Sequence, residues 1–159
     1  MRRAAGVLPV ALAALLALAA GAARAGEGAI APPGPRDRCP VCGMFVAPFP
    51  SWWAEVVLAD GSREVFDGVK DLVRYLGDRK RYAPAREHLA VVRIRVLDYY
   101  GLQPLPAEEA FFVAGSDVLG PMGREFVPLR TQAEAEEFLR DHRGEAILRF
   151  ADLPGRRPE

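Results

Sequence analysis

Apolar and polar positions along residues 53–96 change from the period of a strand to that of a helix and back. Residues 53–58 and 63–66 predict two strands, and Asp60-Gly61 between them is a typical hairpin turn. Residues 89–96 alternate apolar side chains with arginines, so a third strand is expected there. These three segments predict one small antiparallel sheet.

Between the second and third of these strands, apolar residues return every three or four positions, as on one face of a helix. They are Val69, Leu72, Val73 and Leu76. Gly77 is expected to end this helix. Asp67, just ahead of it, is the expected N-cap, because a short carboxylate can accept the first free backbone amides.

The same order of elements begins again in the second half of the chain. Strands are expected at residues 110–114, 124–129 and 146–150, with a glycine-containing loop at 115–123. Thr131 and Glu134 have the spacing of a capping box. They predict a helix that buries Ala135, Phe138 and Leu139 and ends by Gly144.

Two ββαβ units in tandem therefore account for the pattern, and the fold class expected is α+β. The strands should be antiparallel, with the helices packed on one face. This domain is expected to span residues 39–153, after a leader rich in proline and glycine at 26–38 and before a polar tail at 154–159.

Residues 1–25 have the pattern of a cleaved secretory signal peptide. Arg2 and Arg3 precede an apolar run, and Ala23-Arg24-Ala25 fits a cleavage site. The run is short for a membrane span, and no cysteine at the cleavage site offers a lipid attachment point. We expect an exported, extracytoplasmic protein, periplasmic in a Gram-negative cell, with no transmembrane segment in the mature chain.

The charge balance argues against nucleic acid as a partner. The chain has 21 basic and 21 acidic residues, so its formal net charge is zero. The expected signal peptide holds three arginines and no acidic residue, so the remainder is slightly acidic. No basic cluster stands out in the sequence, and a nucleic-acid-binding surface is not expected.

The candidate chemistry lies in the run Cys39-Pro40-Val41-Cys42-Gly43-Met44, which contains both cysteines of the chain. Thiolates and thioethers are soft donors that select Cu(I), zinc or iron–sulfur over magnesium or calcium. A disulfide here would close a very short loop and restrict little chain entropy. The run is therefore interpreted as part of a metal site.

Other residues of the chain could complete such a site. Met122 lies in a loop between Pro121 and Gly123, where it could be a metal ligand or simply cover the edge of the core. Met44 could likewise be a ligand or pack beneath the cysteines. His88 and His142 could add a nitrogen, although solvent exposure and a helix C-terminus explain them as well.

Three classes of function remain open from the residues alone. Cu(I) needs only two or three soft ligands, which the cysteines and methionines supply, whereas structural zinc usually takes four Cys or His ligands. A dithiol redox protein is the third class, but Gly43 and Pro48 prevent the helix that such a site normally starts. No nucleophile with a base, paired carboxylates or phosphate loop indicates an enzyme.

Two segments resemble the NosL family, the copper accessory proteins of nitrous oxide reductase. The first is CPVCGMFVAPFPSWWAEVVLADGSREVFDGVKDLVRYL, and the second is GPMGREFVPLRTQAEAEEFLRDHRGEAILRF. The CxxCGM opening also occurs in small YHS metal-associated domains. The second segment, with its Met-Gly, Val-Pro strand and capped helix, distinguishes the two families.

The resemblance implies a monomeric periplasmic copper chaperone with a tandem ββαβ fold. By motif, Cys42 and Met122 would be the Cu(I) ligands, with Met44 and Cys39 as second choices. The client would be nitrous oxide reductase, reached through a membrane-associated assembly complex. Many members of the family are lipoproteins, and this chain lacks the acylated cysteine.

Overall fold

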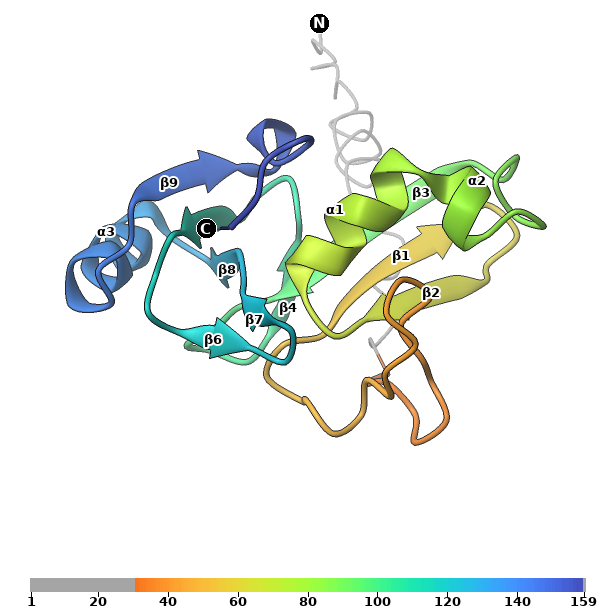
Figure 1. The fold of residues 1–159 in the computed structure, drawn as a ribbon, viewed down its shortest axis with the longest axis horizontal. Coiled ribbons are helices and arrows are strands. Elements are labelled where there is room, and N and C mark those ends of the chain that lie inside the picture. The colour runs from red at the N-terminus through yellow and green to blue at the C-terminus, as the bar shows by residue number, and fades with distance from the viewer. Residues whose placement is uncertain (1–30, 159) are drawn as a thin grey trace, which may run out of the picture. The chain divides into compact units, whose positions relative to one another are not determined.

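Strand β1 (Ala54–Leu58) is the centre of the first sheet in the computed structural model, which describes residues 31–158 (Figure 1). It pairs antiparallel with β2 (Arg63–Phe66) on one side and with β3 (Val91–Leu97) on the other. Strand β4 (Pro104–Pro106) adds to the outer edge of β3. Gly61, at a φ of +82°, forms the predicted turn between β1 and β2.

Helix α1 (Val69–Gly77) covers this sheet and contacts β1 and β2. Its inward face carries Leu72, as the periodicity of the sequence predicts, and Tyr75, which that pattern did not include; both are fully buried. Val73 and Leu76, which the pattern also assigned to this face, are only half-buried. A single turn, α2 (Arg79–Tyr82), follows α1 and leads toward β3. This first half of the domain therefore has a helix on one face of an antiparallel sheet.

The second sheet repeats the strand order of the first. Strand β5 (Phe111–Ala114) is central, between β8 (Val127–Leu129) and β9 (Ala146–Arg149), and all pairs are antiparallel. Helix α3 (Gln132–Asp141) packs on it and begins with the predicted capping box of Thr131 and Glu134. A short 3₁₀ turn, η1 (Phe150–Asp152), follows β9.

The α+β fold class with antiparallel strands is confirmed, and the segment between β5 and β8 departs from the predicted order of elements. The predicted loop contains a small hairpin of β6 (Leu119–Gly120) and β7 (Gly123–Arg124). The predicted strand 124–129 is divided, because Glu125 and Phe126 leave the ladder between β7 and β8. Both side chains are buried, so the chain turns inward at this point.

The predicted N-cap of α1 is wrong. Gly68 is the N-cap residue and no side chain adjacent in sequence caps the helix. The buried carboxyl of Glu125 takes this role instead, because its Oε1 accepts the backbone amide of Lys70 at 2.5 Å. Acidic groups are favoured at a helix N-terminus, where backbone amides lack partners. The start of α1 is thus held by the second half of the domain.

Both ends of the described chain are attached to the domain. The guanidinium of Arg63 donates to the carbonyl of Ala31, and the carbonyl of Pro158 accepts the amide of Gly115. The predicted signal peptide at residues 1–25 lies outside the described residues. None of the helices within residues 31–158 has the length and apolar character that a bilayer span requires.

Replacing Gly68 with alanine is expected to destabilise the fold. A Cβ at this position would overlap the Glu125 carboxyl, with Cδ only 2.8 Å away. Because both groups are buried and held by backbone contacts, we expect a loss of about 1–3 kcal/mol in the free energy of unfolding. Urea denaturation of Gly68→Ala measures this directly.

Gly77→Ala is the matched control in the same helix, because a Cβ there meets no atom within 4 Å. It should be neutral or stabilising. Equal denaturation midpoints for the two variants would contradict the close packing of Glu125 on Gly68.

Candidate metal site

The two cysteines lie on a tight turn held by its own backbone. Gly43 donates its amide to the carbonyl of Cys39, and Cys39 donates to the carbonyl of Met44, each at 2.9 Å. Gly43 has a φ of +79°, which residues with a side chain rarely adopt. The turn therefore folds the second cysteine back toward the first.

Arg38 fastens this turn from outside. Its Nη1 donates to the carbonyl of Gly43 at 2.8 Å, and its guanidinium lies 3.7 Å above the ring centre of Phe45. Residues 38 and 45 also form an isolated antiparallel bridge. These contacts give the turn a defined shape although it belongs to neither sheet.

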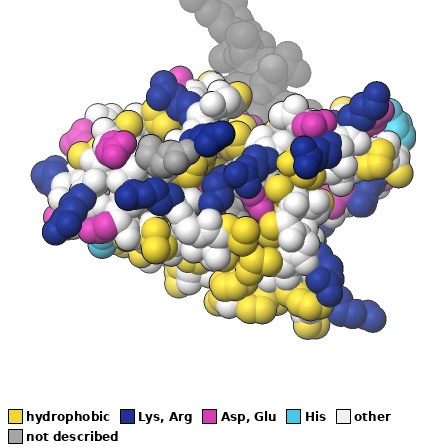
Figure 2. All heavy atoms as spheres, viewed as in Figure 1, with side chains coloured by type: hydrophobic (Ala, Val, Ile, Leu, Met, Phe, Trp, Pro, Cys, Tyr) yellow, Lys and Arg dark blue, Asp and Glu magenta, His cyan; other side chains and the backbone are white. Residues whose placement is uncertain are grey.

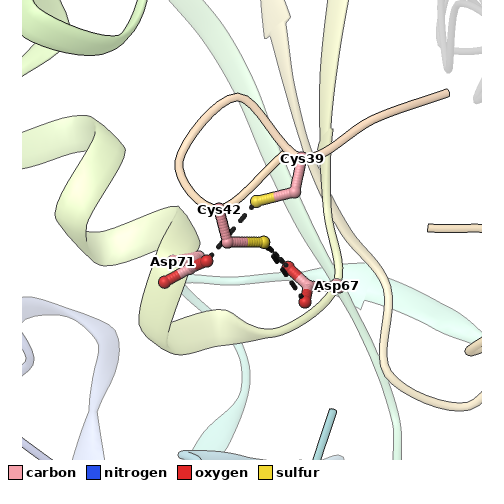
Figure 3. Close-up of side chains that lie close together, drawn as sticks. All are labelled: Cys39, Cys42, Asp67 and Asp71. Atoms are coloured by element: carbon pink, nitrogen blue, oxygen red, sulfur yellow. Dashed lines mark hydrogen bonds between the residues drawn. The ribbon is translucent and has the colours of Figure 1, made fainter. Parts of the chain in front are cut away.

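Four side chains converge where this turn meets α1 (Figure 3). The Sγ of Cys39 lies 3.5 Å from Oδ2 of Asp71, and the Sγ of Cys42 lies 3.4 Å from Oδ1 of Asp67. The ligand atoms of all four residues lie within 4.8 Å of one another. Both cysteines are free thiols, so the group offers two sulfur and two carboxylate donors to one metal ion.

The surroundings of the thiols favour their protonated form. Burial raises the pKa of the Cys39 thiol, with a smaller contribution from the Asp67 carboxylate. Burial also raises the pKa of Cys42, and the charge of Asp67 acts in the same direction. Metal binding to either thiol would therefore displace its proton, which the thiol donates to a neighbouring carboxylate in a hydrogen bond.

Asp67 faces the thiols because Glu125 occupies the position at the helix start. Lys70, which lies between Asp67 and Asp71 in sequence, joins the start of α1 to the hairpin that carries Met122. Its Nζ donates to the carbonyls of Met122 at 2.7 Å and Arg124 at 2.8 Å. The hairpin that carries Met122 is thus attached to the helix end that presents the carboxylates, and Figure 1 shows β7 beside the start of α1.

The structure brings Cys39 and Cys42 together in one cluster, whereas Met44 and Met122 lie on two different segments of the chain. Met44 is half-buried in the cysteine turn, and Met122 is 44% exposed at the tip of the β6–β7 hairpin. His88 is exposed between α2 and β3. His142 ends α3, where its ring stacks at 4.3 Å on Phe138. Within the described residues, the four-residue cluster contains no histidine.

The sequence prediction missed both aspartates. Asp67 was assigned to the helix cap. Asp71 lies opposite the apolar face that the helical period predicts, so its burial was not expected. Their i, i+4 spacing places both carboxylates on one side of the helix start. The signal available in the sequence was a pair of aspartates four residues apart at the start of a predicted helix, in a chain that also has a CxxC pair.

The structure therefore belongs to the class of α+β domains, and it carries two thiols beside two carboxylates at the start of a helix. A family model described as NosL matches residues 31–157, and the chain belongs to the NosL family. The resemblance found in the sequence is confirmed.

Two solved structures are similar to this chain. The crystal structure of the copper chaperone NosL from Shewanella denitrificans has 23% identity and a TM-score of 0.66, over 82% of this chain and 98% of that one. The solution structure of the apo-NosL protein from Achromobacter cycloclastes has 27% identity and a TM-score of 0.44, over 63% and 83% of the two chains. No match was found among curated proteins.

Alkylation of the two thiols should occur in a fixed order. Cys42 is half-buried and Cys39 is only 1% exposed, so iodoacetamide should label Cys42 first. Replacing Asp67 with asparagine removes a charge that disfavours the thiolate, which should accelerate labelling of Cys42 at pH 8 by up to about tenfold. Mass spectrometry of timed samples measures both effects.

Asp60→Asn removes the same charge from the exposed β1–β2 turn and serves as the control. It should label at the rate of the unmodified sequence. An Asp67→Asn rate equal to this control would contradict the electrostatic role of Asp67.

Stability should also depend on pH through Glu125. Burial raises the pKa of this carboxyl to about 8, although the amides of Phe126 and Lys70 partly oppose the shift. Between pH 4.5 and about 8 the unfolded chain loses this proton while the folded chain keeps it. The contribution of the protonated Glu125 carboxyl to the free energy of unfolding is complete below this window. It falls as the pH rises through the window, by up to about 1.4 kcal/mol per pH unit.

Glu125→Gln retains an oxygen for both backbone amides and cannot ionise, so its unfolding free energy should fall less between pH 5 and 8. Urea denaturation at the two pH values compares it with Glu109→Gln, which changes an exposed carboxylate. Parallel pH dependence in the two variants would show that Glu125 does not carry this effect.

Proposed function

We propose that this protein is an exported Cu(I) chaperone that carries copper to the assembly of a copper enzyme. The observation that carries the proposal is the pair of reduced thiols at the start of α1, in a chain of the NosL family. Soft thiolate donors suit Cu(I) and provide strong binding with few ligands. The similar structure from Shewanella denitrificans is of a copper chaperone.

In the proposed site, Cys42 is the principal ligand and Met122 the second. Cys42 is the more accessible of the two thiols, and Met122 is exposed on a hairpin tied to α1 through Lys70. Cys39 and Met44 are the further candidates. A ligand pair from two separate segments at the surface suits a carrier, because an incoming donor can replace one ligand at a time.

The aspartates contribute to copper uptake by holding the thiol protons. The S–H of Cys42 points to the carboxylate of Asp67, and that of Cys39 to Asp71. Thiols bind metals as thiolates, so these protons leave as Cu(I) arrives. The carboxylates also place negative charge beside the cation once it is bound.

A dithiol redox role receives no support from the electrostatics of the site. Reactive cysteines in such proteins have lowered pKa values, which keep the attacking thiolate populated. Here burial and Asp67 raise both values.

Zinc binding is the second candidate function, because the two carboxylates extend the donor set to four ligands. Zinc takes four ligands in structural sites and accepts carboxylate oxygen as well as thiolate sulfur.

The client in this proposal is nitrous oxide reductase, and delivery takes place outside the cytoplasm through a membrane-associated assembly complex. Family membership supports this assignment. The signal peptide expected from the sequence would bring the protein, as a monomer, to that compartment.

An anaerobic Cu(I) titration of the reduced protein, against a competing chelator, tests the proposal. One Cu(I) should bind per chain, and Cys42→Ala should weaken binding by more than about tenfold through loss of a thiolate. Met122→Ala should weaken it less, because a neutral thioether is the poorer donor. The same titration with Zn²⁺ measures the preference between the two metals.

Leu119→Ala is the control for Met122→Ala, because it shortens another exposed apolar side chain on the same hairpin. It should bind Cu(I) like the unmodified protein. Copper binding that is indifferent to Cys42, or zinc binding that is tighter than Cu(I) binding, would overturn the copper assignment.

A further inference from the structure

A hollow of about 590 Å³ lies between α1 and the C-terminal segment. Five basic side chains line it, from α1, β7 and the tail; they are Lys70, Arg74, Arg124, Arg156 and Arg157. Figure 2 shows Lys and Arg side chains gathered across the middle of this face. Its volume falls within the range of about 300–1,000 Å³ that is usual for ligand sites.

No acidic residue is among the described residues that line this hollow. A second basic hollow, near Arg63 and Arg86, is different because acidic residues form part of its lining. There Arg63 pairs with Asp37 at 3.4 Å and Arg86 with Glu64 at 2.6 Å. The hollow beside α1 therefore concentrates positive charge in a chain whose formal net charge is zero.

The hydrogen bonds of two of these cations go to neutral groups. Lys70 donates to the carbonyls of Met122 and Arg124, and Arg124 donates to those of Gly115 and Ser116. Backbone carbonyls orient the side chains and leave their formal charge in place. The lining is therefore fixed in position before any anion arrives.

The hollow is adjacent to the proposed copper site. Arg74 forms an ion pair at 3.1 Å with Asp71, one of the four clustered residues. Lys70 lies immediately before Asp71 on α1 and holds the hairpin of Met122. A molecule that occupied the hollow would thus lie beside both segments that supply the proposed ligands.

We propose that this hollow docks an acidic segment of the protein that exchanges copper with this chain. The assignment of the partner rests on the proposed copper function. Carboxylate side chains match this basic lining in charge, and Arg can bind carboxylates through two parallel hydrogen bonds. Val73 and Pro158 add apolar surface against which the aliphatic parts of the segment can pack.

The shape of the site favours a peptide segment over a lipid surface. The basic side chains line a recess between a helix and a loop, whereas a membrane presents its headgroups as a nearly flat layer. An extended segment can place several carboxylates into the recess. Charge complementarity of this kind accelerates encounter and fixes the orientation of partners.

Calorimetric titration of the full chain with a hexaglutamate peptide tests the proposal, with hexaglutamine as the uncharged probe. The acidic peptide should bind and the neutral one should not, and added salt should weaken binding. Arg156→Glu, which reverses one charge in the lining, should weaken the peptide affinity by about tenfold. Arg93→Glu makes the same change at an exposed position of β3 outside the hollow and should have little effect.

The Cu(I) affinity of Arg156→Glu is measured separately and should equal that of the unmodified protein. A failure of copper binding would then be distinct from a failure of docking. Equal weakening by Arg93→Glu and Arg156→Glu would show only nonspecific attraction and would overturn the proposal. Binding to phosphatidylserine vesicles through Arg156, without binding of the acidic peptide, would also overturn it in favour of a lipid surface.

Discussion

The hydrogen bond from Lys70 to Glu125 joins two segments that are 55 residues apart, and the candidate site depends on it. The amides at the start of a helix need acceptors, and here the acceptor comes from the segment between β7 and β8. Because Glu125 occupies the space over Gly68, the helix starts at a fixed position against the second half of the domain. The helix start, its aspartates and the β6–β7 hairpin are thereby held in one arrangement.

This arrangement also explains how two acids come to lie beside two thiols. Asp67 would ordinarily turn toward the helix amides, but the Glu125 carboxyl already accepts the amide of Lys70. Asp67 is 2% exposed and accepts a hydrogen bond from Cys42. A buried carboxylate next to thiols is electrostatically costly in the absence of a cation. Asp71 has such a cation in the guanidinium of Arg74 at 3.1 Å, and in the proposed site the bound Cu(I) would place a second positive charge beside Asp67.

Local signals in the sequence predicted most of the fold and part of the site. The strands of both sheets other than β4, the turn at Gly61 and the capping box at Thr131 were predicted because each depends on neighbouring residues. The cap of α1 was not predicted. The preference for aspartate as an N-cap is judged from neighbouring residues, whereas Glu125, which accepts the helix amide in its place, is distant in sequence. The strand expected at 124–129 was divided for the same reason, since Glu125 turns inward to reach Lys70.

Lys70 holds the hairpin of Met122 through two main-chain carbonyls, those of Met122 and Arg124. The methionine side chain takes no part in these two hydrogen bonds. Residue 122 can therefore change while its attachment remains. In the proposed copper site, another donor at this position, such as histidine or cysteine, would lie on an unchanged framework. The metal preference of that site would then change without a change of fold.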